Sequence, residues 1–381
     1  NEDPYSRIAM NHDLMRGIKG GQPFVLMEQT PSVTNWLAYN ALKRPGVMRL
    51  WSYQAMAHGA DAVLLFQMRR SIGACEKYHG AVIVHVGTEN TRVFREISQL
   101  GKELQQLGDK TLGARSRAKA AILVDWDNWW ALELCSGPTK DMDYLLQVAH
   151  YYRAFHKQNI AVDIVKFTSD LDSYKVVVAP LAYMVKPGFA ERLTKFVENG
   201  GTLIGTYMTG IADETDRCIF GAYPGPLRNV FGLWVEETDA LYPEETNQII
   251  MNENREVYSC SFLCARLRLE NAKTLGTYGS DFYAGEPCVT VNEYGKGKAY
   301  YLGTQPDEAF LKMFVHKVCE EADVHPVLQV EEGIEVTSRE NENGKFYFVM
   351  NHNAAEKQIV LPEGKWENLI GAQTENGKLI L

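Results

Sequence analysis

Glu28 is the residue whose type and position most clearly suggest chemistry. It ends the apolar run Phe24-Val25-Leu26-Met27 and comes just before Gln29-Thr30-Pro31-Ser32. Enzymes built on a (β/α)8 barrel carry their catalytic groups at the carboxyl ends of buried strands, where the loops begin. From position and flanks alone, Glu28 could equally be a carboxylate that pairs with a cation or a helix end. The pattern therefore leaves a catalytic and a structural interpretation open.

The elements around Glu28 predict part of a barrel. We expect a helix near 7–19, the strand ending at Glu28, a second strand over 62–66 and a helix from about 91 to 107. Both strands are continuously apolar, which is typical of parallel strands buried on both faces. Only 27 residues precede Glu28, whereas a complete barrel takes about 250. We therefore expect residues 1–110 to be the last βα units of a TIM barrel.

Two further domains are predicted after this region. Residues 115–323 alternate strands and helices, which predicts an open, mostly parallel, doubly wound flavodoxin-like α/β domain with a late hairpin near 287–303. Residues 326–381 contain short alternating strands around an Asn341-Glu342-Asn343-Gly344 turn, and a further turn is expected at Asn376-Gly377. These features predict a small antiparallel, β-sandwich-like domain.

Composition excludes several classes of function. The 381 residues carry a net charge of −9 and contain no long basic stripe, so we expect no nucleic-acid partner. The sequence has no 18-residue apolar run, which argues against a membrane span, and the polar start Asn1-Glu2-Asp3-Pro4 argues against a signal peptide at this terminus. Seven scattered cysteines without a C-x-x-C pair argue against disulfides and zinc and predict a cytoplasmic protein. We expect neither a metal nor a cofactor.

A dense, ordered set of motifs between Leu26 and Gly80 resembles the β-galactosidases of glycoside hydrolase family 42. The later blocks fit the same family, whose barrel is followed by an α/β domain used for trimer contacts and by a small β domain. The matching segments are Leu26–Ser32, Asn35-Trp36, Pro45–Gln54, Ala57–Asp61, Phe66–Arg69 and Glu76–Gly80.

The resemblance implies roles for four residues. Glu28 matches the nucleophile, a carboxylate that attacks the anomeric carbon and forms a covalent glycosyl-enzyme. Trp36 matches an aromatic residue that borders galactose, since an indole face packs well against the C–H face of a sugar. Glu76 and His79 match a pair that holds galactose hydroxyls. Without the resemblance, Trp36 could simply cover the barrel rim, and Glu76 and His79 could be a surface pair.

Other polar residues of the matching region are interpreted as structural. Arg49, Trp51 and Gln54 should lie on a helix that packs outside the barrel, and His58 should precede the next strand at the non-catalytic end. Gln67 and Arg69, at the end of the second strand, could belong to either group.

The second catalytic carboxyl is expected to be absent from this chain. Retaining glycosidases need an acid/base roughly 5–5.5 Å from the nucleophile, and the family takes it from an Asn-Glu pair three βα steps earlier. Asn1-Glu2 has the required residue types, but only 25 residues separate Glu2 from Glu28. One βαβ unit alone takes about 30 residues, so Glu2 is too close in sequence.

The cluster Asp125-Trp126-Asp127-Asn128-Trp129-Trp130 follows a strand at the rim of the doubly wound sheet. Such crevices often bind ligands, and the residue types could suggest a sugar site. The sequence contains neither G-x-G-x-x-G nor a Walker motif nearby. We expect these tryptophans to pack against the barrel or to line its rim in a neighbouring subunit.

The resemblance implies two candidate functions. The first is a retaining glycosidase that releases terminal β-D-galactose from β-galactosides, forms a homotrimer through the middle domain and lacks its acid/base in this chain. The second is a catalytically inactive assembly module of such an enzyme.

Overall fold

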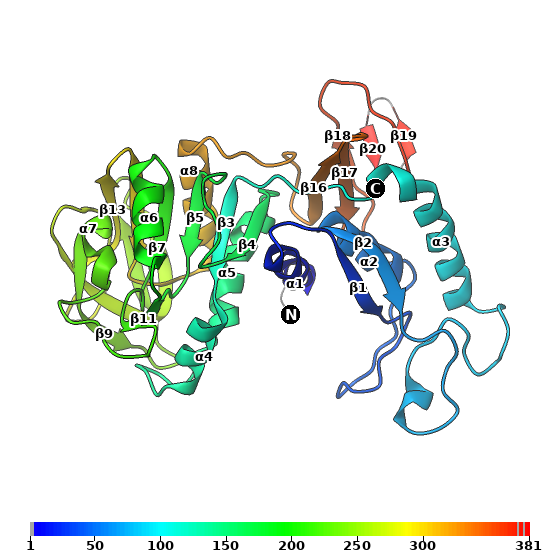
Figure 1. Cartoon of the computed structure of the whole chain (residues 1–381), viewed down its shortest axis with the longest axis horizontal. Coiled ribbons are helices and arrows are strands. Elements are labelled where there is room, and N and C mark those ends of the chain that lie inside the picture. The colour runs from blue at the N-terminus through cyan, green and yellow to red at the C-terminus, as the bar shows by residue number, and fades with distance from the viewer. Residues whose placement is uncertain (1–3, 372, 376–377) are drawn as a thin grey trace. The chain divides into compact units, whose positions relative to one another are not determined.

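A computed structural model describes residues 4–371, 373–375 and 378–381 of the chain. The Asn1-Glu2 pair and the expected Asn376-Gly377 turn lie outside these residues. The chain forms two compact units (Figure 1). The first unit combines Asn1–Arg117 with Val327–Leu381, and the second unit is Ala118–Pro326.

The first unit begins with the expected alternation of helices and strands. The strand ending near Glu28, the strand over 62–66 and the flanking helices are all confirmed. The last helix continues to Thr111, four residues beyond its predicted end. The elements are α1 (Pro4–Ile18), β1 (Phe24–Gln29), α2 (Val47–Ala57), β2 (Ala60–Leu65), the 3₁₀ turn η1 (Cys75–Tyr78) and α3 (Arg92–Thr111).

Strands β1 and β2 form a parallel pair connected through α2, in which Leu26 lies opposite Val63 and Gln29 opposite Leu65. Burial on both faces, which the apolar runs predicted, is wrong for this chain. Val25, Met27 and Leu64 are exposed, because the described residues supply only two strands of this sheet. The alternation of exposed and partly buried side chains marks one face of the pair that the described residues of the first unit leave uncovered.

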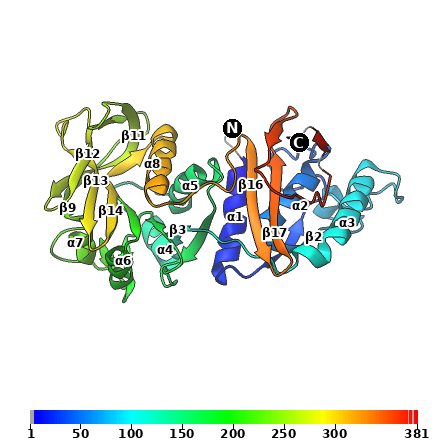
Figure 2. The same ribbon diagram turned by 90° about the horizontal axis from the view of Figure 1, so that it is seen from above.

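The C-terminal segment packs on the helices of the first unit (Figure 2). Phe348 and Met350 of β17 share a buried apolar cluster with Met56 and Ala57 of α2 and with Leu107 of α3. The predicted hairpin is confirmed, with Asn341 paired to Gly344 across its turn. The strands are β16 (Ile334–Asn341), β17 (Gly344–Asn351), β18 (Gln358–Val360), β19 (Gln373–Glu375) and β20 (Lys378–Ile380).

The second unit is built on one mixed sheet. Its parallel strands follow the order β14 (Gly297–Leu302), β7 (Thr202–Thr206), β5 (Val176–Ala179), β3 (Ala120–Val124) and β4 (Val162–Lys166). Antiparallel pairing continues the sheet through β13 (Pro287–Tyr294), β12 (Lys273–Tyr278), β10 (Asn247–Met251), β11 (Val257–Leu269), β9 (Leu233–Ala240) and β15 (Thr304–Pro306). The expectation of a mostly parallel sheet is therefore wrong, since more of the described pairings are antiparallel than parallel. Strands β9, β10, β11 and β12 lie within 233–278 and follow one another without a helix between them, which favours antiparallel pairing.

The second unit shows the expected alternation of strands and helices and the expected hairpin near 287–303. The short strands β6 (Met184–Val185) and β8 (Ala212–Asp213) form a separate parallel pair.

Helices α4 (Trp126–Leu134), α5 (Tyr144–His156) and α8 (Glu308–Glu321) begin at carboxylate caps. Asp125, Asp143 and Asp307 each accept a hydrogen bond from the backbone N–H three residues on, which satisfies a donor that the helix leaves unpaired. Gly200 has φ +110° just after α6, as expected for a glycine that ends a helix. The helices are α4 (Trp126–Leu134), α5 (Tyr144–His156), α6 (Phe189–Glu198), η2 (Gly225–Leu227), α7 (Arg228–Phe231) and α8 (Glu308–Glu321).

Among the described residues, no helix combines the length and the apolar character that a membrane crossing requires.

Candidate active site

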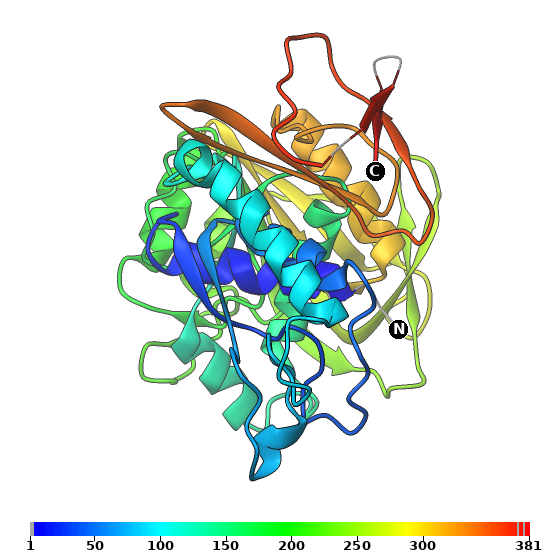
Figure 3. The ribbon, with the colours of Figure 1, turned by 90° about the vertical axis from the view of Figure 1, so that its right-hand side faces the viewer.

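Glu28 lies on β1, one residue before the strand ends, and its side chain is exposed. Because β1 and β2 are parallel, their carboxyl ends meet at the same edge of the pair. The two loops that follow them extend from this edge, and η1 lies in the second loop (Figures 1 and 3). The fold thus places Glu28 at the base of these two loops.

Hydrogen bonds to backbone carbonyls hold the two loops together. The Asn35 side chain donates to the Cys75 carbonyl at 2.9 Å, and the Gly80 N–H donates to the Val33 carbonyl at 2.6 Å. A Cβ on Gly80 would lie 2.9 Å from that same carbonyl oxygen. Only glycine therefore permits this close approach of the loops.

The loop contact brings Trp36 and His79 together. Their rings stack with centroids 5.2 Å apart and planes 21° from parallel. Phe66 meets the His79 ring edge-on at 5.1 Å. His79 is fully buried, whereas Trp36 remains 60% exposed. The histidine is therefore fixed beneath an indole that is still largely accessible.

His79 and Glu76 each offer a buried polar atom without a partner. His79 Nδ1 lies 2.9 Å from the Gly80 carbonyl, so Nδ1 carries the proton and Nε2 is an acceptor. His79 Nε2 and Glu76 Oε2 are buried and make no hydrogen bond within the described part of the chain. An unsatisfied buried polar atom costs free energy, and a hydroxyl group of a ligand could satisfy either one.

The geometry connects three of the four predicted site residues. Trp36 stacks on His79, and the backbone N–H of His79 donates to the backbone carbonyl of Glu76 at 3.1 Å. Within the described ranges, no hydrogen bond or ring contact joins Glu28 directly to these three. The shared edge of β1 and β2 is what relates it to them.

Lys43 is a residue at this edge that sequence reasoning missed. Its ammonium donates to the Gln29 side chain at 3.0 Å and to the Thr30 carbonyl, and it lies 4.9 Å from the centre of the Trp51 ring. Burial lowers the pKa of Lys43 to about 8. No motif marks this lysine, because its partners are a backbone carbonyl, an amide and an aromatic ring.

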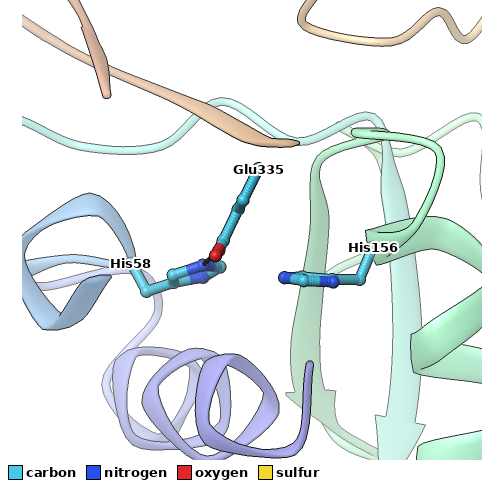
Figure 4. Close-up of side chains that lie close together, drawn as sticks. All are labelled: His58, His156 and Glu335. Atoms are coloured by element: carbon cyan, nitrogen blue, oxygen red, sulfur yellow. Dashed lines mark hydrogen bonds and ion pairs between the residues drawn. The ribbon is translucent and has the colours of Figure 1, made fainter. Parts of the chain in front are cut away.

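His58 lies at the opposite end of β2, in a buried ionic network. Its Nδ1 lies 2.8 Å from Asp13. Its Nε2 lies 2.5 Å from Glu335 (Figure 4). Burial lowers the pKa of His58, but the two carboxylates outweigh burial and raise that pKa to about 9. Asp13 also pairs with Arg16. These contacts fit the structural interpretation of His58.

The Asp125–Trp130 cluster forms the start of α4 and not a separate acidic site. Lys186 pairs with Asp125 at 2.7 Å and with Asp127 at 2.6 Å. Asn128 is buried, and its amide bonds to the Leu181 carbonyl and the Met184 N–H, each at 2.9 Å. These side chains anchor α4 to the second unit.

Three family models match the chain. Residues 1–107 match a model described as β-galactosidase, residues 118–325 match the β-galactosidase trimerisation domain, and residues 333–381 match the β-galactosidase C-terminal domain.

Individual relatives agree with these matches. The β-galactosidase BgaP of Planococcus sp. strain L4 is 54% identical over 384 residues, and the β-galactosidase BgaB of Geobacillus sp. is 47% identical over 371 residues. These matches cover 100% and 97% of the chain but only 57% and 55% of the relatives. The chain thus spans little more than half the length of the curated relatives it matches.

Solved structures of β-galactosidases match equally well. The enzyme of Bacillus circulans sp. alkalophilus has a TM-score of 0.98 at 52% identity, covering 100% of this chain and 57% of that one. The enzyme of Rahnella sp. R3 has a TM-score of 0.93 at 43% identity, covering 99% and 56%.

Proposed function

We propose that this chain, which belongs to the β-galactosidases of glycoside hydrolase family 42, carries the nucleophile of a retaining β-galactosidase. The reaction releases terminal β-D-galactose from β-galactosides. Glu28 attacks the anomeric carbon, and Trp36, Glu76 and His79 hold the galactose ring. The acid/base carboxyl comes from polypeptide outside these 381 residues.

The observation that carries this proposal is the pair of unsatisfied buried atoms in the loop after β2, where the His79 ring stacks on Trp36. His79 Nε2 and Glu76 Oε2 are both acceptors, each buried and without a partner among the described residues. Vicinal sugar hydroxyls are donors of matching chemistry. The exposed indole of Trp36 offers an apolar surface beside them, as the C–H face of galactose requires.

The proposed chemistry has two displacement steps. In the first, a Glu28 carboxylate oxygen bonds to the anomeric carbon while the acid/base gives its proton to the departing glycosidic oxygen. In the second, the acid/base removes a proton from water, and that water displaces Glu28 with a second inversion. Glu28 is exposed at the strand end and free to meet a substrate there.

We assign the domains to the same architecture. The β1-α2-β2 unit within 1–110 corresponds to the last βα units of a TIM barrel, and 326–381 to the small β domain. In 115–323, numbering the five parallel strands along the chain gives the spatial order 2-1-3-4-5, which is the flavodoxin-like order. This middle domain would form a homotrimer with two other copies.

A cytoplasmic location fits the cysteines. All seven are free thiols, and four of them are buried, as expected for a reducing compartment.

The exposed face of β1 and β2 favours the second candidate, an assembly module that performs no hydrolysis alone. Val25, Met27 and Leu64 are uncovered, so the barrel interior is open in this chain. Loss of a general acid alone removes roughly 10²–10⁴ in rate.

Turnover of nitrophenyl β-galactoside separates these candidates. It should be measured with the chain alone and with the completed enzyme, meaning this chain preceded by the remaining barrel segment. We expect activity only in the completed enzyme, and its loss on Glu28→Gln. Equal activity of the Glu28→Gln variant would exclude Glu28 as the nucleophile, and activity of the chain alone would exclude the assembly module.

A further inference from the structure

Helix α4 presents an apolar stripe to solvent. Trp126, Trp130 and Leu134 follow one another at intervals of four residues, which places them along one face of the helix. They are 39%, 56% and 86% exposed. We call these three residues the α4 stripe.

The exposure of the α4 stripe does not come from a loosely attached helix. Asn128 and Leu132 lie on the opposite face and are buried. The Asn128 amide is satisfied on both sides by the backbone that follows β5, and Asp125 caps the first turn. The helix is therefore anchored through one face while the other stays uncovered.

The residue types of the stripe are those of an interface centre. Its three positions carry two tryptophans and a leucine and no charge, whereas the charged residues Asp127 and Glu133 are next to stripe residues in sequence. Trp126 is also supported by Trp129, with ring centroids 5.3 Å apart. Protein interfaces enrich aromatic residues at an apolar centre and keep charged groups at the rim.

From these observations we infer that the α4 stripe contacts a second copy of this chain. The inference rests on the proposed homotrimer, because residues 118–325 match a trimerisation domain and α4 lies within that range. In a closed ring of three subunits, each interface joins two different surfaces. The stripe of one copy therefore meets a different surface of the next copy, not the same stripe.

Sedimentation velocity over a range of concentrations tests this inference. The variants are Trp130→Glu and Leu134→Glu, with Tyr242→Glu as the matched control, since Tyr242 is 73% exposed in the same unit. Far-ultraviolet circular dichroism and a thermal melt establish that each variant is folded. Leu134 ends the helix and is almost fully exposed, so its replacement leaves the fold intact even if Trp130→Glu does not.

We expect a trimeric parent chain and a trimeric Tyr242→Glu variant. The trimer of each folded stripe variant should dissociate at a protein concentration roughly 30-fold higher, or more, than the trimer of the parent chain, which is the scale of an interface hot spot. Folded stripe variants that remain as trimeric as the parent would overturn the inference and leave the homotrimer standing. A parent chain that is monomeric throughout would contradict the homotrimer itself. If the parent chain bound galacto-oligosaccharide and both stripe variants lost this binding while remaining trimeric, the stripe would be a carbohydrate-binding surface instead.

Discussion

The indole of Trp36 lies on the imidazole of His79, with ring centroids 5.2 Å apart and planes 21° from parallel. The two residues come from different loops, one after β1 and the other after β2. The stack fixes the His79 ring while its Nε2 remains without a partner in the described structure. This relationship links the fold of the βαβ unit to the proposed recognition of galactose.

His79→Ala in the completed enzyme should lower kcat/KM for nitrophenyl β-galactoside roughly 10- to 100-fold, the scale of one hydrogen bond in a desolvated site. Steady-state kinetics measures the effect. His316→Ala is the control, because His316 is an exposed residue of α8. If the two variants were equally active, His79 would have no part in substrate binding.

Gly80→Ala should disturb the Trp36–His79 stack by pushing apart the backbones of the two loops that carry these residues. The new Cβ would lie 2.9 Å from the Val33 carbonyl oxygen and 3.1 Å from the Ser32 nitrogen, so the loops must separate. We expect a loss of about 1–3 kcal/mol in the free energy of unfolding, measured by urea titration. Gly73→Ala lies in the same loop with open space around its Cβ and should change stability little. Equal stability of the two variants would contradict the close loop contact.

Arg339 should be among the most stabilising charged residues of the first unit. Its buried guanidinium donates to the carbonyls of Ala114, Met56 and Ala60 and pairs with Asp61 at 2.7 Å. Arg339→Met should cost about 3–5 kcal/mol, because it leaves buried partners unpaired.

The surface pair of Arg117 with Glu340 provides the comparison for Arg339. Arg117→Met should cost less than about 1 kcal/mol, since exposed pairs contribute little. Urea unfolding monitored by tryptophan fluorescence gives both values. A smaller loss for Arg339→Met than for Arg117→Met would show that the buried contacts do not stabilise the unit.

Stability should fall between about pH 6.5 and pH 9 through His58. Its folded pKa of about 9 lies above the ordinary value of 6.5, so the stabilisation is complete below pH 6.5 and is lost as pH rises through 9. The pKa of His12 is lowered to about 4, first by burial and then by His58. The contribution of His12 to stability is therefore lost only as pH falls below 6.5, outside the range in which His58 acts.

Thermal melts across pH 6–10 measure this dependence. His58→Gln should flatten the decline, whereas His325→Gln, which alters an exposed histidine, should not. A His58→Gln variant with the same decline as the parent would assign the pH dependence to other groups.

The sequence predicted the parts of the fold that local pattern determines. The apolar run before Glu28 is β1, and the repeated strands and helices of the middle block are present in order. No individual strand was predicted within 207–286, because β9 to β12 owe their pairing to residues distant in sequence. Leu263 pairs with Ala240, and Ile249 with Tyr278. Such contacts leave little trace in a short window of sequence.

Side-chain partners were predictable only where a motif marks them. Trp36, Glu76 and His79 belong to the segments that resemble the family, and the structure joins them. A helix over 126–134 was not predicted, although Asp125 is a residue type that caps helices and does so here. Lys43 had no signal, because its contacts with Gln29, Thr30 and Trp51 arise only when the loop folds back.

Trapping the covalent intermediate tests the central claim most directly. The completed enzyme should be incubated with a 2-deoxy-2-fluoro-galactoside that carries an activated leaving group, which slows the second displacement, and its peptides should then be analysed by mass spectrometry. We predict a single fluorogalactosyl adduct on Glu28 and none on the Glu28→Gln variant. An adduct on a different carboxylate, with Glu28 unmodified, would contradict the assignment of Glu28 as the nucleophile.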